Sequence, residues 1–252
     1  MASDACAKLP PVSSDYVPKG TYETIAGLKT YVIGPESPSK AIIDIYDVFG
    51  ISPQALQGAD RISAALDALV IVPDFFEGVY ANPSWLPVDT EEKAAAFGKF
   101  RAERADVPRN VAKLLEVRKA AGERWASAGD NWGVFGLCWG GKIGVLACGE
   151  GNEGPGRVFK VGGTAHPGGL AAEDAEALTA AYICLASPGE PEEVVRQYEE
   201  ILARPGKVGV VETYKDMFHG WMGARANLSD ERNKSEYERG YSQVAEFFAK
   251  YL

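Results

Sequence analysis

The chain has 252 residues, of which 46% are hydrophobic and 24% charged, as in a globular protein and unlike a disordered or fibrous chain. Its 26 basic and 35 acidic side chains give a formal charge of −9, which argues against nucleic acid and anionic membrane surfaces as partners. The length suggests one large domain.

The first 20 residues carry Ser, Pro and Gly without periodicity, so we expect an N-terminal arm over residues 1–20 and a single domain over 21–252. Strands are predicted at 21–25 and 28–33, joined by a hairpin turn, and again at 41–46 and 69–74. The apolar spacing over 54–68 predicts a helix. The charged, Ala-rich stretch near 90–127 predicts one or two more helices.

The second half of the chain alternates strands with helices. Strands are predicted at 132–137, 160–165, 181–186 and 208–214, and helices at 140–148, 172–180, 191–203 and 231–251. Most of these strands are continuous apolar runs, which are typical of a parallel sheet covered on both faces. The pattern predicts a doubly wound α/β fold with an antiparallel N-terminal edge.

The cysteine count and the N-terminal sequence bear on the compartment. Four cysteines are too few and too scattered for a disulfide framework, and no CxxC pair suggests zinc, so we expect neither metal nor cofactor. The N-terminus lacks the pattern of a secretory signal, and no apolar run approaches the roughly 18–20 residues that span a bilayer. We therefore expect a cytoplasmic protein.

The sharpest motif surrounds Cys138, between a predicted strand and a predicted helix. Gly136 and Gly140 flank the cysteine in the G-x-nucleophile-x-G pattern of a nucleophile elbow. Such a turn is too sharp for neighbouring Cβ atoms, and it places the sulfur at a helix N-terminus that favours thiolate over thiol. We interpret Cys138 as a nucleophile, and Cys6, Cys148 and Cys184, which lack this setting, as structural.

A cysteine nucleophile needs a base, and the chain has two histidines. In α/β-hydrolases the nucleophile is followed by the acid and then by the histidine, after the last strand. This order selects His219, which follows the strand at 208–214. We interpret His166 as a structural hydrogen-bonding residue or a pocket-wall residue, with a substrate contact as the alternative.

The acid of the triad should lie in the loop after the strand at 181–186. No aspartate occurs there, but Glu190 and Glu192 both could reach an imidazole, and glutamate serves as the acid in some members of this fold. We favour Glu190, which lies further into the loop. Glu192 stays an alternative, although it also suits the N-terminus of the helix that follows. Asp60, Arg61 and Asp74 are interpreted as structural.

The chain resembles the dienelactone hydrolase family (carboxymethylenebutenolidase-like α/β-hydrolases), and its fungal branch in particular. The resemblance covers nearly the whole chain from about Gly20, and its motifs lie at 45–50, 59–61, 72–78, 136–141 and 218–221. It implies an α/β-hydrolase fold, a mostly parallel sheet with helices on both faces. It also implies hydrolysis of a small ester or lactone through a cysteine acyl-enzyme.

The resemblance assigns further roles near the cysteine. Asp47 matches the position of a glutamate that, in the family, holds the cysteine proton in the resting enzyme, a thiol-gating role. The backbone amides of Val48 and Trp139 would form the oxyanion hole. The arginine that bacterial members carry after the Pro-Asp motif is missing, and Arg225 is the candidate for the arginine after the histidine. An anionic dienelactone is therefore doubtful as the natural substrate.

The predicted loops around Cys138 are rich in aromatic residues, which suggests an apolar pocket. The candidate substrate-binding residues are Phe76, Tyr80, Trp85, Trp221 and Arg225. The sequence favours a hydrolase of a small-molecule ester or lactone. Two alternatives stay open: a lyase or isomerase in the same pocket, and a non-catalytic ligand-binding protein on the same scaffold. The oligomeric state cannot be read from the sequence.

Overall fold

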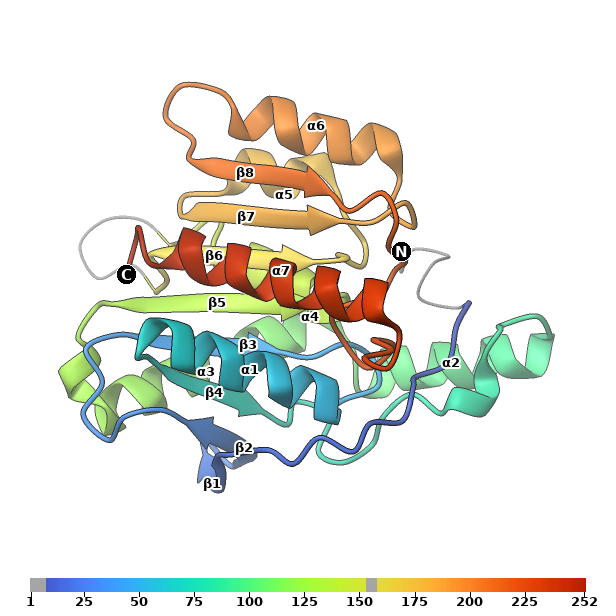
Figure 1. Ribbon diagram of the computed structural model, residues 1–252, viewed down its shortest axis with the longest axis horizontal. Coiled ribbons are helices and arrows are strands. Elements are labelled where there is room, and N and C mark those ends of the chain that lie inside the picture. Colours follow the sequence, from blue (N-terminus) through green and yellow to red (C-terminus); the bar gives the residue numbers. More distant parts are fainter. Residues whose placement is uncertain (1–7, 153–157) are drawn as a thin grey trace.

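The computed structural model describes residues 8–152 and 158–252, and its described residues form one eight-stranded sheet in the order β1-β2-β4-β3-β5-β6-β7-β8 (Figure 1). The strands are β1 (Thr21–Ile25), β2 (Leu28–Ile33), β3 (Ala41–Ile45), β4 (Leu69–Pro73), β5 (Trp132–Leu137), β6 (Val161–Ala165), β7 (Ala181–Ala186) and β8 (Gly209–Thr213). The β1–β2 and β2–β4 pairs are antiparallel and all other pairs are parallel, as predicted.

Helices cover both faces of the sheet. They are α1 (Pro53–Leu66), α2 (Glu91–Glu103), α3 (Val107–Arg124), α4 (Trp139–Ala147), α5 (Ala172–Ala177), α6 (Glu192–Leu202) and α7 (Glu231–Phe248), with short 3₁₀ turns η2 (Pro83–Trp85) and η3 (Ala126–Ala128). Helices α1 and α7 pack side by side on one face, while α4 packs against α3, β5 and β6 on the other (Figure 1). This arrangement confirms the predicted α/β-hydrolase fold.

The Ala-rich stretch near 90–127 forms two helices rather than one. Asp106 caps the second helix by accepting a hydrogen bond from the Arg109 amide, and Pro108 lies in the first turn, where a missing N–H is harmless. The structure also moves one boundary that matters for the site. Helix α4 begins at Trp139, so Cys138 itself is the N-cap residue. No helix in the described ranges is both long and apolar enough to cross a bilayer.

The register of the parallel strands brings their following loops to one edge of the sheet. Ile45 lies opposite Gly136, Leu137 opposite Ala165, and Ala186 opposite Thr213. The loops after β3, β5, β6, β7 and β8 therefore open at the same carboxyl edge, where open α/β sheets bind their ligands. Asp47, Cys138, His166, Glu190 and His219 lie on these five loops.

Candidate active site

Cys138 lies at the sharp turn between β5 and α4. Its φ of 53° and ψ of −111° lie in a strained region for a residue with a side chain, and its amide donates to the Ala165 carbonyl at 3.1 Å. A Cβ added at Gly136 would lie 2.2 Å from the Gly140 carbonyl oxygen, and one at Gly140 would lie 2.2 Å from the Ile45 carbonyl oxygen. Glycine is therefore required on both sides of the cysteine, as in a nucleophile elbow.

His219 and Glu190 form a buried pair at the same edge. The His219 Nδ1 atom lies 2.6 Å from Glu190 Oε1, and both side chains are nearly inaccessible to solvent. Glu190 is fixed in turn, because the Ser187 amide donates a hydrogen bond to its Oε2 atom. One carboxylate oxygen is thus held by the backbone and the other faces the imidazole.

Glu192 lies elsewhere. It is the first residue of α6, is exposed to solvent, and belongs to the acidic first turn that suits the positive end of a helix. Of the two glutamates that the sequence left open, the structure brings Glu190 to the histidine.

His166 is fully buried beside the elbow and beside His219. The two imidazole rings meet edge to face with centroids 5.2 Å apart. Neither ring nitrogen of His166 has a hydrogen-bond partner among the described residues, so of the two predicted roles the structure favours the pocket-wall residue over the hydrogen-bonding residue. Burial, aided by the nearby charges of His219 and Arg225, holds the pKa of His166 well below its usual value. His166 is therefore a neutral wall against the second imidazole.

Asp47 follows β3 and lies across the same edge. Its Oδ1 accepts the Phe49 amide at 2.9 Å, and its Oδ2 accepts the Ala224 amide at 2.9 Å, six residues before Asp230 caps α7. Burial raises the pKa of the Asp47 carboxyl, while these two amides and the charges of Arg225 and His219 oppose that rise. The carboxyl therefore joins the loop after β3 to the loop that carries the histidine.

The two amides assigned to the oxyanion hole lie next to these residues in the chain. Trp139 is the first residue of α4, so its N–H has no acceptor within the helix. Its indole packs against Phe76, with ring centroids 4.4 Å apart, and donates to the Ala105 carbonyl at 3.0 Å. Val48 directly follows Asp47, and its carbonyl accepts the Ala81 amide at 3.0 Å.

Three of the predicted substrate-binding aromatics lie in one cluster with Trp139. Phe76 is fully buried there and contacts Phe100, which in turn contacts the half-buried Trp85. Tyr80 is half-buried, and its hydroxyl donates to Asp74 at 3.0 Å. The cluster forms one apolar side of the region around the elbow.

Two predicted substrate contacts are placed differently from our expectation. Trp221 is fully buried, stacks on Tyr214 at 4.3 Å and faces Gly240 of α7, so it belongs to the core. Arg225 is 3% exposed, and its guanidinium donates to the Leu9 carbonyl at 2.5 Å and to the His219 carbonyl at 3.4 Å. The guanidinium is held by the chain itself, which argues against the predicted role as a substrate clamp.

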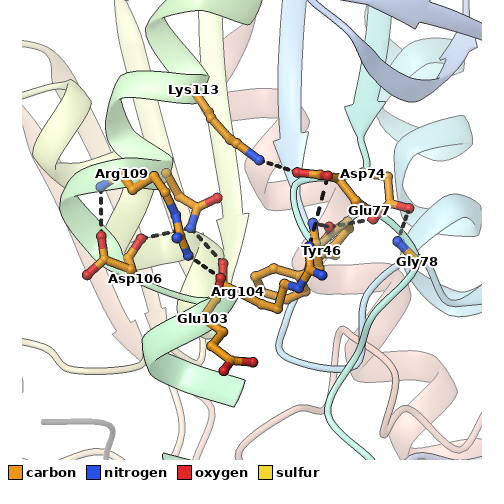
Figure 2. A network of polar contacts seen from close by, with 11 residues as sticks. Tyr46, Asp74, Glu77, Gly78, Glu103, Arg104, Asp106, Arg109 and Lys113 are labelled. Atoms are coloured by element: carbon orange, nitrogen blue, oxygen red, sulfur yellow. Dashed lines mark hydrogen bonds and ion pairs between the residues drawn. The ribbon is translucent and has the colours of Figure 1, made fainter. Parts of the chain in front are cut away.

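Hydrogen bonds and an ion pair connect the loop after β4 to the aromatic cluster and to α3 (Figure 2). Asp74 accepts hydrogen bonds from the Tyr46 hydroxyl at 2.8 Å and the Gly78 amide at 2.9 Å, and Glu77 pairs with Lys113 (Figure 2). The structural interpretation of Asp74 is confirmed. Asp60 is also structural, because it accepts the hydroxyls of Tyr16 and Tyr31.

Among the other ionisable side chains of the described residues, the candidates for a second site are metal ligands and reactive thiols. No group of three or more His, Cys, Asp and Glu side chains in the described ranges is placed to hold a metal ion. Burial raises the pKa of both Cys148 and Cys184, as expected of inert structural thiols. Cys6 lies outside the described residues.

The sequence model of the dienelactone hydrolase family matches residues 28–252, almost the whole chain. The chain belongs to this family. Among its relatives are two uncharacterized AIM2 family proteins of Schizosaccharomyces pombe. One is 33% identical and spans 90% of this chain and 88% of the relative, and the other is 34% identical and spans 94% of each.

Comparison of the structure with solved structures also finds proteins of the dienelactone hydrolase fold. A Klebsiella pneumoniae protein assigned as a dienelactone hydrolase superposes with a TM-score of 0.71 at 17% identity, covering 92% of this chain and 99% of that one. This structural similarity shows that the two chains share a fold. The match to the family model places the chain among hydrolases.

Some contacts at the site were not predicted from the sequence. The Ser187 amide that fixes Glu190 is a backbone group, and so is the Leu9 carbonyl that binds Arg225. Gln54 was also missed, although it is fully buried and its amide donates to the Val12 and Ala226 carbonyls. The sequence signal that could have indicated Gln54 is an amide side chain in the first turn of an amphipathic helix.

Proposed function

We propose that this chain hydrolyses a small carboxylic ester or lactone through an acyl-enzyme on Cys138. The observation that carries the proposal is the shared edge: a strained cysteine at a helix N-terminus and a buried His219–Glu190 pair on neighbouring loops. This is the nucleophile, base and orienting acid of a catalytic triad.

In the first half of the reaction, the Cys138 sulfur attacks the substrate carbonyl and its proton passes to His219. Glu190 accepts a hydrogen bond from the Nδ1–H group and, as a carboxylate, stabilises the imidazolium that forms. The oxyanion is bound by the amides of Val48 and Trp139, each donor typically contributing about 2.7–4 kcal/mol. The C–O bond then breaks, and the leaving alkoxide takes the proton from His219.

In the second half, water attacks the thioester. His219 takes a proton from that water, the C–S bond breaks, and the sulfur regains its proton as the carboxylic acid leaves. In a lactone the alcohol and the acid belong to one product molecule. A reducing compartment such as the cytoplasm suits this chemistry, because the nucleophile must be a free thiol.

Asp47 gates the thiol in this scheme by opposing thiolate formation until substrate arrives. Its support is the position of this carboxyl, which is buried on the loop beside the elbow and accepts a hydrogen bond from the loop that carries His219. The hydrogen bonds to Phe49 and Ala224 limit how far this carboxyl can turn, so its proton exchange with the sulfur would accompany a shift of the loop that carries His219.

Hydrolysis of a panel of esters and lactones in oxygen-labelled water tests the proposal. Hydrolysis places one solvent oxygen in the carboxylate product, whereas a lyase or isomerase reaction does not. Cys138→Ser should abolish most turnover, because an alcohol needs a stronger base than a thiol of pKa ~8.5. Cys148→Ser is the matched control, since Cys148 ends the same helix at its opposite terminus and should leave turnover unchanged. Unlabelled product, or equal loss in both variants, would contradict the proposal.

A further inference from the structure

The structure describes residues 8–20 of the N-terminal arm, which precede the residues matched by the family model and are nevertheless hydrogen-bonded to the loop that carries His219. We call residues 214–226, which carry His219, the histidine loop. The Val12 amide donates to the Ala224 carbonyl at 2.8 Å. The buried amide of Gln54 joins the two segments, donating to Val12 at 2.7 Å and to Ala226 at 3.2 Å. The arm is thus hydrogen-bonded to the histidine loop directly and through α1.

Arg225 connects the arm to the catalytic histidine. Its Nε donates to the Leu9 carbonyl at 2.5 Å, and its Nη1 donates to the backbone carbonyl of His219 at 3.4 Å. The aliphatic part of Arg225 lies beneath Gly220, where an added Cβ would be 2.6 Å from Arg225 Cδ. The guanidinium also lies 5.1 Å from the Phe49 ring. One buried side chain therefore touches the arm, His219 and the loop that carries Asp47.

The arm also borders a pocket. Residues 11–14 line a pocket of about 630 Å³ together with Phe49, Ile51 and Tyr80. Further along the arm, the Tyr16 hydroxyl and the Lys19 amide donate to Asp60. Because residues 11–14 are exposed or only half-buried, hydrogen bonds rather than close packing hold the arm, and with it the Leu9 carbonyl, in place.

We propose that the N-terminal arm is a positioning element for His219, acting through Arg225. The Leu9 carbonyl fixes the guanidinium, and the guanidinium holds the His219 backbone so that the imidazole stays paired with Glu190. A displacement of about 1 Å at a catalytic group can lower the rate about a hundredfold. This inference rests on the proposed hydrolase function for its kinetic readout but not for its structural one.

Deletion of residues 1–14 tests the proposal by removing Leu9 and Val12 while keeping the anchors at Asp60. We expect kcat to fall at least about tenfold with little change in KM, because the base and not the substrate contacts is displaced. Arg225→Met should cause the same loss. The two changes combined should be no worse than either alone, because both break one chain of contacts.

Two control variants separate positioning from general damage. Deletion of residues 1–7 leaves every described contact in place and should leave kcat unchanged. Tyr16→Phe loosens the arm at its other end, so it should lower the melting temperature without lowering kcat. If the deletion of residues 1–14 does not fold, Gln54→Met carries the test, because it removes the side-chain anchor of Val12. Wild-type kcat in the long deletion, or additive losses with Arg225→Met, would overturn the proposal.

Histidine NMR gives a readout that does not need hydrolysis. The chain has two histidines, so the imidazole spectrum contains two sets of signals, and His166→Phe assigns them. Deletion of residues 1–14 should shift the His219 signals, whereas deletion of residues 1–7 should not. If no ester or lactone is hydrolysed, the proposed function fails while this shift still supports the positioning role. Unshifted His219 signals in the folded long deletion would refute that role.

Discussion

The Glu190 side chain contacts His219 because the backbone of the turn after β7 binds its carboxylate on the side away from the imidazole. The Ser187 amide binds one carboxylate oxygen and directs the other at the imidazole. The elbow motif selected Cys138 as the candidate nucleophile and sequence order selected His219 as the candidate base, and the structure places both on loops at the same edge of the sheet. Sequence order could not separate Glu190 from Glu192, because both flank Pro191 and only the backbone of the turn decides which side chain faces inward. Trp221 shows the same limit, since its proximity to His219 in sequence did not reveal its stacking on Tyr214.

Exchange of each glutamate for glutamine tests this assignment. Glu190→Gln keeps the shape but removes the charge that stabilises the imidazolium, so kcat should fall by roughly 10²- to 10⁴-fold. Glu192→Gln changes an exposed residue at the start of α6 and should alter kcat by less than about twofold. Steady-state kinetics on one activated ester measures both. The reverse ranking would move the acid by two residues.

The gating role of Asp47 predicts opposite changes in two rates. Asp47→Asn removes the carboxylate that opposes thiolate formation, leaving the helix N-terminus and His219 to favour thiolate. Alkylation of Cys138 by iodoacetamide at neutral pH should become faster while ester turnover becomes slower. Asp44→Asn is the matched control, because Asp44 is also a buried carboxyl and lies three residues earlier, inside β3. Superimposed alkylation curves for folded Asp47→Asn and the wild type would end the gating idea.

Periodicity and apolar runs identified all eight strands that the structure describes, and every stretch of the chain in which its α-helices lie. The split between α2 and α3 was left open, because alanine-rich charged sequence continues across it and only Asp106 and Pro108 mark the new start. The attachment of the arm could not be predicted either. Its contacts use backbone carbonyls and amides of Leu9 and Val12, which any sequence possesses.

The close backbone contact at the junction between β5 and α4 predicts how a substitution at Gly136 changes stability. Gly136→Ala places a Cβ against the Gly140 backbone, which cannot yield without moving α4, so the free energy of unfolding should fall by about 3 kcal/mol or more. Gly98→Ala is the control, because Gly98 lies inside α2 with no atom within 4 Å of an added Cβ. That change should stabilise by up to about 1 kcal/mol. Urea denaturation of both variants measures the difference, and equal stabilities would contradict the close approach.

The stability of the whole molecule should depend on pH through Asp44, a 1% exposed carboxyl inside β3 with no side-chain partner among the described residues. Burial raises the pKa of Asp44 to about 8. The folded state therefore binds a proton that the unfolded chain has already lost above about pH 4. Asp44 therefore lowers the free energy of unfolding progressively as pH rises from about 4 to about 8, and this loss of stability is complete above pH 8.

Asp44→Asn removes this dependence while nearly preserving shape. The free energy of unfolding of the wild type should fall, relative to the variant, by up to about 1.4 kcal/mol per pH unit between about pH 4 and pH 8. Tyr237 and Tyr241, which face Asp44, do not titrate in this range, because burial raises the pKa of each. Urea denaturation at several pH values measures the difference. Parallel stability curves would show that Asp44 is ionised in the folded protein.

Intact-protein mass spectrometry of a rapidly quenched reaction tests whether an acyl-enzyme forms on Cys138. After mixing with an activated ester, we expect a transient mass increase equal to one acyl group, mapped by peptide analysis to Cys138 and absent from Cys138→Ser. The adduct should persist longer in Glu190→Gln, because the water that clears it also depends on His219. Release of product without any adduct at Cys138, or an acyl group on another residue, would show that Cys138 is not the nucleophile.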